Sequence, residues 1–292
     1  MRPRIVEALN ALFDTSVFHW LIPVPAVIYA IAMLVAFIVW MRRSKSSDLS
    51  TFHITGAAFC MMVAGLLGTR VFFLIQHWRE TLAHPQQIFD PTGGLTSWGA
   101  YLGGVIGLLL YCRFYRLRVL PYADAAVPCL GLGIALGRWS CFLNGDDYGT
   151  LSSLPWAVRF PHGSYPFVAQ VQAGLLSPLQ DLSLPIHPVQ LYLSLNGLAL
   201  FFLASWFYKR FRLLRGATFC FYWILYCSTR FLLEFFRGDQ KQLFLGTFTV
   251  PQLMSILTVI PASIALWYVL RRHKEQSPEP TPAMDSRIAE AA

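Results

Sequence analysis

The sequence predicts an all-α polytopic membrane protein with about seven transmembrane helices and a small cap on its outer side. Of the 292 residues, 55% are hydrophobic and only 13% are charged, and the mean hydropathy is +0.50. This composition excludes an ordinary soluble domain and is typical of a chain that crosses a bilayer several times. Apolar runs of about 20 residues, the length that a helix needs to cross the hydrocarbon, recur along the chain.

The apolar runs place the expected spans at 21–41, 53–76, 95–112, 121–143, 188–207, 217–236 and 248–270. The second run is the least regular, because His53 and Arg70 interrupt it. Basic residues cluster at 42–45, 113–118, 209–215 and 271–274, which are alternate ends of these spans. Because loops rich in Arg and Lys stay on the inner side, we expect the N-terminus outside and the C-terminus inside.

The net charge of +8 is therefore mainly a topology signal, and its inner clusters would also favour anionic membrane lipid. No motif indicates nucleic-acid binding. The six cysteines fall within the expected spans or at their ends, without the spacing of metal ligands, so we expect neither a metal site nor another cofactor.

Outside the spans, the chain carries three appendages. Residues 1–20 have the apolar spacing of a helix that lies on the outer surface. The membrane domain covers 21–274 and includes a cap at 144–187, which is too short for a core of its own. Its Trp156, Phe160, Tyr165 and Phe167 indicate that the cap packs on the membrane domain, and we expect the tail at 275–292 to be disordered.

Three arginines, Arg70, Arg138 and Arg230, fall inside the expected spans. A guanidinium in hydrocarbon is costly and is normally kept only where it faces a partner, a water-filled cavity or a substrate. Three of them in one small membrane protein indicate an anionic ligand at bilayer depth, and a phospholipid headgroup fits best.

Structural alternatives stay open for these arginines. Arg230 and Glu234 are four residues apart, so they either form a mutual salt bridge or Glu234 orients Arg230 toward a phosphate. Arg70 serves the same ligand or donates to backbone carbonyls between helices. Arg237 falls just past the span, and we expect it to extend to the headgroups.

Two further segments lie at the outer ends of spans. His187 and Pro188 open the fifth span at the depth of Asn144 and Tyr148, so His187 is either a hydrogen-bonded loop residue or part of a site. The glycine-rich run at 93–104 permits either close helix packing or a backbone turn around a substrate.

Five motifs in order resemble the prolipoprotein diacylglyceryl transferase family over about residues 20–270. Tyr29 matches a tyrosine of the first span, and Gly68-Thr69-Arg70 is similar to the Gly-x-Arg of the second. The stretch from Gly137 to Gly149 resembles the signature G-R-x-G-N-F-x-N-x-E-x-x-G. The last two motifs are His187-Pro188-Val189-Gln190-Leu191-Tyr192, similar to H-P-x-Q-L-Y, and Tyr226 to Arg237, similar to Y-x-x-x-R-x-x-x-E-F-F-R.

The chain departs from the family pattern at several positions. Cys141 replaces the signature asparagine, Asp146 replaces the signature glutamate, and Leu193 stands where a glutamate often follows H-P-x-Q-L-Y. Trp98, before Gly99, stands where many members have the histidine of H-G-G. An indole cannot take a proton from a thiol, so any base must be a different group.

The resemblance implies a bacterial cytoplasmic (inner) membrane enzyme whose site faces the periplasm. Such an enzyme moves the diacylglyceryl group of phosphatidylglycerol to the lipobox cysteine of a preprolipoprotein, without a cofactor. On this basis we expect catalytic roles for Arg138, Arg230 and His187. The expected substrate-binding residues are Tyr29, Arg70, Trp98, Gly99, Asn144, Asp146, Gly149, Gln190, Tyr226 and Glu234.

Two other hypotheses stay open. Trp98, Cys141 and Asp146 are compatible with a relative on the same scaffold that uses another lipid-transfer chemistry or acceptor. Alternatively, the arginines form a docking or permeation site of a non-enzymatic anionic-lipid binder or transporter, although transporters commonly carry internal repeats and none is detected here.

Overall fold

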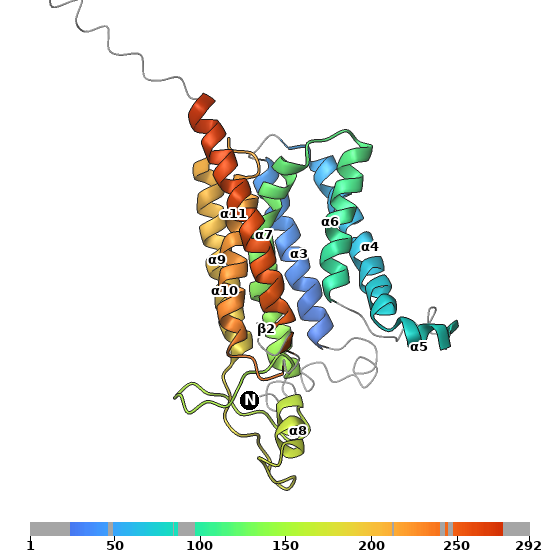
Figure 1. The fold of residues 1–292 in the computed structure, drawn as a ribbon, viewed down its shortest axis with the longest axis vertical. Coiled ribbons are helices and arrows are strands. Elements are labelled where there is room, and N and C mark those ends of the chain that lie inside the picture. The colour runs from blue at the N-terminus through green and yellow to red at the C-terminus, as the bar shows by residue number, and fades with distance from the viewer. Residues whose placement is uncertain are drawn as a thin grey trace, which may run out of the picture. The chain divides into compact units, whose positions relative to one another are not determined.

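The computed structural model describes residues 24–45, 49–83, 85–86, 97–211, 213–239, 243–244 and 248–276. In this part of the chain the structure is helical, apart from a short antiparallel hairpin of β1 (Leu243–Phe244) and β2 (Phe248–Thr249). The helices are α3 (Val24–Lys45), α4 (Thr51–Gln76), α5 (Trp78–Ala83), α6 (Ser97–Phe114), α7 (Val119–Asn144), α8 (Tyr165–Gln172), α9 (Val189–Phe211), α10 (Ala217–Glu234) and α11 (Val250–Gln276) (Figure 1).

The long helices α3, α4, α6, α7, α9, α10 and α11 occupy the ranges predicted as spans, so the all-α polytopic fold is confirmed. Their ends differ from the prediction by a few residues. At the last span the predicted start at residue 248 is wrong, because β2 precedes the helix there. The predicted surface segment at 1–20 and the tail beyond residue 276 lie outside the described residues.

Five of these helices, α3, α4, α7, α9 and α11, contain apolar stretches long enough to cross a bilayer. In α6 the apolar part, Gly99–Phe114, is shorter. In α10, Arg230 and Glu234 interrupt the apolar sequence. Because length and composition do not settle these two helices, seven crossings and the orientation of the chain stay predictions.

The chain forms two compact units, and the first comprises Met1–Met33 and Leu130–Ala292. Within it, α10 packs against both α9 and α11 (Figure 1). The rings of Phe207 and Phe221 stack between α9 and α10 with centroids 4.2 Å apart. Close to the start of α9, Ser194 Oγ donates to the carbonyl of Ala135 at 2.6 Å, which ties α9 to α7.

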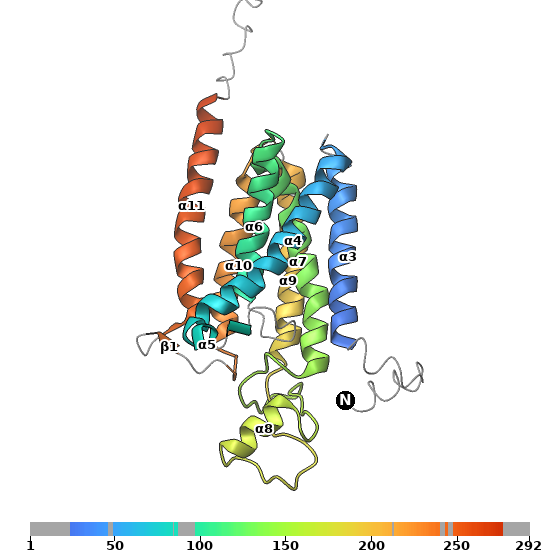
Figure 2. The ribbon, with the colours of Figure 1, turned by 90° about the vertical axis from the view of Figure 1, so that its right-hand side faces the viewer.

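The predicted cap belongs to this unit and lies beyond the ends of α7 and α9 in both views (Figures 1 and 2). It contains α8 and isolated bridges such as Val158 to Ile186. Of the aromatic residues expected to pack the cap on the membrane domain, Phe160 lies against the ring of Phe142 in α7, and Trp156 Nε1 donates to Tyr192 Oη of α9 at 2.8 Å. Phe167 is buried, and Tyr165 is more than half exposed.

The second unit, Leu34–Cys129, contains α4 and α6, whose backbones approach closely through glycines. A Cβ atom at Gly99 would lie 2.0 Å from the carbonyl oxygen of Gly68, and one at Gly103 would lie 2.1 Å from that of Ala64. A side chain at either position would force the helices apart. Gly99 and Gly103 of this run therefore serve helix packing, the first of the two interpretations left open by the sequence.

We expect Gly103→Ala to destabilise the protein by about 1–3 kcal/mol, because its methyl group would overlap the backbone of α4. The neighbouring Gly104→Ala is the matched control, since a Cβ there meets its nearest atom, the Met61 carbonyl oxygen, at an ordinary 3.9 Å. Since alanine has a higher helix propensity than glycine, we do not expect Gly104→Ala to destabilise the helix itself. Thermal unfolding in detergent compares the two variants, and equal stabilities would contradict the packing argument.

Candidate active site

The site is built where α7 ends and the chain turns back. Gly145 ends the helix with a φ of 78°, and its N–H donates to the carbonyl of Cys141 at 2.8 Å. Glycine is the usual residue for this left-handed position. Two residues later, Asp147 also has a positive φ, of 52°, which is uncommon for a residue with a side chain. The turn therefore holds the Asp147 carboxylate in a constrained position.

Asp147 bridges two arginines from different parts of the chain. Its Oδ2 pairs with Nη1 of Arg138, on the last turns of α7, and its Oδ1 pairs with Nη2 of Arg237, just after α10. Arg237 also donates through Nε to Asp239 Oδ1 at 2.9 Å. The expectation that Arg237 extends to the headgroups is wrong, because its side chain is 4% exposed and paired with two carboxylates.

Around this bridge, the backbone segments 148–150 and 236–238 are hydrogen-bonded to each other. Gly149 and Arg237 form an antiparallel bridge. The N–H of Thr150 donates to the carbonyl of Phe236, and the N–H of Gly238 donates to that of Tyr148, both at 2.9 Å. A Cβ at Gly149 would lie 2.3 Å from the carbonyl oxygen of His187, so only glycine fits between the two segments.

The charges of the bridge support one another. Burial alone would raise the pKa of Asp147, but the Arg138 and Arg237 guanidiniums outweigh it and hold the pKa of this carboxyl below its ordinary value. Burial acts to lower the pKa of Arg237, and the Asp239 and Asp147 carboxylates raise it overall. Asp147 therefore stays ionised at neutral pH, and its stabilising contribution is lost only in acid, below its ordinary pKa.

One turn beyond Arg138 lies the cysteine that replaces the signature asparagine. Cys141 Sγ is 3.1 Å from Tyr29 Oη and 3.9 Å from Arg138 Nη1. Tyr29 lies on α3 and its ring also approaches Gly137, where a Cβ would meet it at 3.1 Å. The structure thus brings Tyr29 and Arg138 together through Cys141.

Asn144, Asp146 and Gln190 form a second cluster beside the turn. Asn144 Nδ2 donates to Asp146 Oδ2 at 2.8 Å, and Gln190 Nε2 donates to the Asp146 carbonyl at 2.7 Å. Two buried acceptors, Asp146 Oδ1 and Gln190 Oε1, have no hydrogen-bond partner within the described residues. Because buried polar atoms are normally satisfied, these two acceptors are candidates for a donor on a ligand.

His187 lies against the same loop, behind Gly149. Its Nδ1 is 3.3 Å from Tyr192 Oη, and its ring packs edge-on against Phe236 at a centroid distance of 5.2 Å. The imidazole is partly exposed. His187 therefore lies beside Gly149 and Thr150, while its depth in the membrane stays a prediction.

Arg230 and Glu234 form a buried ion pair on α10. Glu234 Oε1 also accepts a hydrogen bond from Thr249 Oγ1 at 3.0 Å, and Thr249 N–H donates to Gln252 Oε1 at 3.0 Å. The pair predicted from sequence spacing therefore exists, and it ties α10 to the start of α11. Tyr226, one turn before Arg230, stacks with the ring of Tyr222.

Three predicted site residues belong to the second unit. The Arg70 guanidinium lies over the ring of Phe73, 5.6 Å from its centroid. Gly99 contacts the backbone of Gly68. Trp98 is helical in α6, and its side chain lies outside the described part of the structure.

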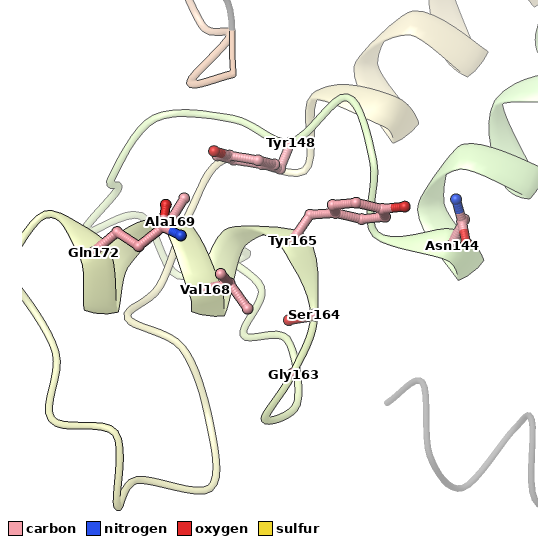
Figure 3. Close-up of a pocket in the computed structure, with 8 residues that line it drawn as sticks. All are labelled: Asn144, Tyr148, Gly163, Ser164, Tyr165, Val168, Ala169 and Gln172. Atoms are coloured by element: carbon pink, nitrogen blue, oxygen red, sulfur yellow. The ribbon is translucent and has the colours of Figure 1, made fainter. Parts of the chain in front are cut away.

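A cavity of about 570 Å³ opens beside the turn, between Asn144 and Tyr148 at the start of the cap and residues 163–172 farther along it (Figure 3). The side farther along is formed by the loop at Gly163 and Ser164 and by one face of α8. Sequence reasoning did not predict this cavity, because its walls come from segments that only the folded cap brings together.

Ligand-type atoms of Cys141, Asp146 and Asp147 lie within 4.8 Å of one another. Both oxygens of Asp147 are already taken by guanidiniums, and Asp146 Oδ2 accepts from Asn144. Two adjacent positive charges also oppose a cation. The donor set thus fits an arginine-bound carboxylate better than a metal ion.

Comparison with known proteins shows the family of this chain. Residues 16–268 match the family model described as prolipoprotein diacylglyceryl transferase. The chain belongs to this family. A phosphatidylglycerol--prolipoprotein diacylglyceryl transferase of Clostridium tetani is 30% identical over 260 residues, covering 89% of this chain and 94% of that protein. The protein of the same name from Synechococcus elongatus is 29% identical over 266 residues, covering 88% of each.

The family pattern makes Asp147 stand out, since it occupies a position that the signature leaves open. Asp146, at the place of the signature glutamate, contacts Asn144 instead of an arginine. Asp146 was predicted to bind substrate, and no role was predicted for Asp147. The Asp-Asp pair after Gly145 was the available signal, because a second acidic residue beside two buried arginines needs a counter-charge.

We expect Asp147→Asn to lower the free energy of unfolding by about 3–5 kcal/mol, because it leaves two partly buried guanidiniums without their shared carboxylate. Asp239→Asn is the matched control: it removes a carboxylate from Arg237 alone and leaves the Arg138 pair intact. Unfolding in detergent and transferase activity are measured together. An Asp147→Asn protein as stable and active as Asp239→Asn would show that the bridge does not organise the site.

Proposed function

We propose that this chain transfers the diacylglyceryl group of phosphatidylglycerol to the lipobox cysteine thiol of preprolipoproteins, in the bacterial cytoplasmic membrane. The observation that carries the proposal is Arg138, fixed by Asp147 at the end of an apolar helix and adjoining Tyr29 and Cys141. Family membership supports the reaction, and the guanidinium supplies what its leaving group needs.

The reaction is a displacement at carbon. The thiolate sulfur forms a bond to the glyceryl carbon, the bond from that carbon to the phosphate oxygen breaks, and glycerol phosphate departs. The thiol proton passes to a base or to the departing phosphate. Since a thiol with a pKa of about 8.5 is mostly protonated at neutral pH, both deprotonation and stabilisation of the leaving anion accelerate transfer.

In this proposal Arg138 binds the phosphate, and a planar guanidinium suits two phosphate oxygens. Arg230 supplies the second positive charge and Glu234 orients it. Tyr29 helps to place Arg138 through Cys141. Asp146 and Gln190 accept hydrogen bonds from the headgroup hydroxyls, a role supported by their two unpartnered buried oxygens.

The remaining predicted residues have supporting roles in the proposal. Asn144 holds Asp146, and Gly149 permits the close approach of His187. Tyr226 supports Arg230 from the preceding turn of α10. Substrate binding by Arg70, Trp98 and Gly99 stays a prediction from the sequence, in which Trp98 occupies the family's histidine position. The orientation proposed for the chain puts this site on the periplasmic side of the membrane.

The direct test is thioether formation on a lipobox peptide in vesicles of phosphatidylglycerol. We expect Arg138→Lys to lower kcat/KM by about 100-fold, because lysine keeps the positive charge but cannot donate two parallel hydrogen bonds to the phosphate. Lys209→Arg, at the end of α9, is the control with an unchanged site. Full activity of Arg138→Lys would contradict bidentate binding, and a wild type that lipidates no lipobox peptide would favour a relative with another acceptor or lipid.

Arg230→Lys separates the two interpretations of the ion pair on α10. A loss of activity at unchanged stability supports phosphate binding. A loss of stability alone would assign the Arg230–Glu234 pair to the structural tie between α10 and α11.

His187 is the proposed base in place of the family's histidine, because it lies beside the loop and histidine takes up protons near neutral pH. We expect His187→Gln to lower the rate at pH 6–7 by at least about 10-fold, with partial recovery as the pH approaches the pKa of the thiol. The measurement is transfer rate against pH. A wild-type profile in His187→Gln would show that the thiol loses its proton without this side chain.

A further inference from the structure

The cavity beside the turn has one wall made by a fixed helix face. In α8, Phe167 and Gln170 are buried, and Gln170 Oε1 accepts from the N–H of Leu184 at 2.7 Å. The opposite face carries Tyr165, Val168 and Gln172, at helical spacing, and these side chains line the cavity (Figure 3). The cap therefore holds this face in place although Tyr165 is 59% and Val168 41% exposed.

The other wall comes from the turn after α7. Asn144 and Tyr148 line it, and Asp146 and Asp147 lie between these two residues in the sequence. Figure 3 shows the Tyr148 and Tyr165 side chains on either side of the open space. The cavity is thus continuous with the loop that fixes Arg138, although no residue of its lining takes part in the arginine bridge.

The lining carries no formal charge. It offers hydroxyl groups from Ser164 and two tyrosines, amides from Asn144 and Gln172, and apolar contact from Val168. Burial and the nearby Asp239 raise the pKa of Tyr148, so this phenol is neutral at physiological pH. The lining has no cationic side chain, which a phosphate favours, whereas a neutral polypeptide finds both hydrogen-bonding groups and an aromatic surface.

The distance to Arg138 fits a peptide that continues from the acceptor cysteine. Asn144 follows Arg138 by six residues, which is about 9 Å along a helix axis. An extended chain covers that length in about three residues. The thiol must reach the lipid beside Arg138, so the residues that enter the cavity would be those about two to four positions after the cysteine.

We propose that this cavity binds the uncharged polypeptide segment immediately following the acceptor cysteine. The proposal rests on the proposed transferase function and adds a subsite for the protein substrate. Its neutral lining favours small or polar uncharged residues at these positions. The cationic part of the site is left to the lipid phosphate.

The test uses two lipobox peptides, one ending at the acceptor cysteine as an amide and one continuing for four neutral residues. We expect the longer peptide to have a kcat/KM about 10-fold higher, a gain worth about 1.4 kcal/mol. Val168→Trp fills the cavity and should abolish this advantage, while the KM for phosphatidylglycerol stays unchanged. Leu179→Trp, on a cap residue that is 94% exposed and outside the cavity, is the matched control.

A second variant keeps the test independent of how the cap tolerates tryptophan. Gln172→Glu puts a negative charge on the exposed edge of the cavity. Among longer peptides that carry Lys or Asp two to four residues after the cysteine, we expect this variant to shift preference toward Lys. The wild type and Leu179→Trp should show no such shift.

Two results would overturn the subsite. One is a wild type that uses both peptides equally well. The other is a Val168→Trp protein that lowers kcat/KM for the short and the long peptide by the same factor, together with a Gln172→Glu protein that shows no shift toward Lys. These results leave the transferase function standing, because both peptides are still lipidated. If the wild type modifies neither peptide, the proposed function fails and the subsite fails with it.

Discussion

Two guanidiniums sharing one carboxylate are the interaction on which the rest of this site depends. Like charges repel, and a partly dry environment strengthens the repulsion, so Arg138 and Arg237 lie close together only because Asp147 is between them. The carboxylate is held by a turn with two left-handed residues, Gly145 and Asp147. Local backbone conformation and distant ion pairing therefore determine each other.

This dependence reaches beyond the bridge, because its two arginines belong to segments about a hundred residues apart in the sequence. Once Asp147 joins the end of α7 to the end of α10, the backbones of Tyr148–Thr150 and Phe236–Gly238 can pair. The close contact of Gly149 with His187 then brings the start of α9 to the same loop. Three helix ends are thus fixed around one anion.

The sequence predicted most of the fold, because apolar runs of membrane length are long-range patterns with few alternatives. It also predicted the Arg230–Glu234 pair, since four-residue spacing is a property of a single helix. The prediction for Arg237 was wrong because the position of its side chain depends on contacts between distant segments. Its position past a span indicates an interface residue, and only tertiary contacts with Asp147 and Asp239 bury it.

The same limit applies to the carboxylates and the cap. Asp146 and Asp147 are neighbours in sequence, and which of them faces the arginines is decided by the turn geometry after Gly145. In the cap, Phe167 and Tyr165 are both aromatic residues of one helix, yet one is buried and the other lines a cavity. A helix of eight residues with few partners gives little periodic signal to distinguish its faces.

The resulting distribution of charge separates two kinds of ligand. The guanidiniums of Arg138 and Arg237 are the cationic groups of the bridge, and Asp147 and Asp239 balance their formal charge. A phosphate would therefore be bound there by guanidinium N–H donors and not by a surplus of positive charge. The cavity that begins at Asn144 and Tyr148 has no charged side chain in its lining, so it offers a phosphate no cationic partner. A lipid phosphate and a neutral peptide would therefore be directed to opposite sides of one loop. Such a separation places a nucleophile next to a leaving group without requiring either substrate to compete for the other's contacts.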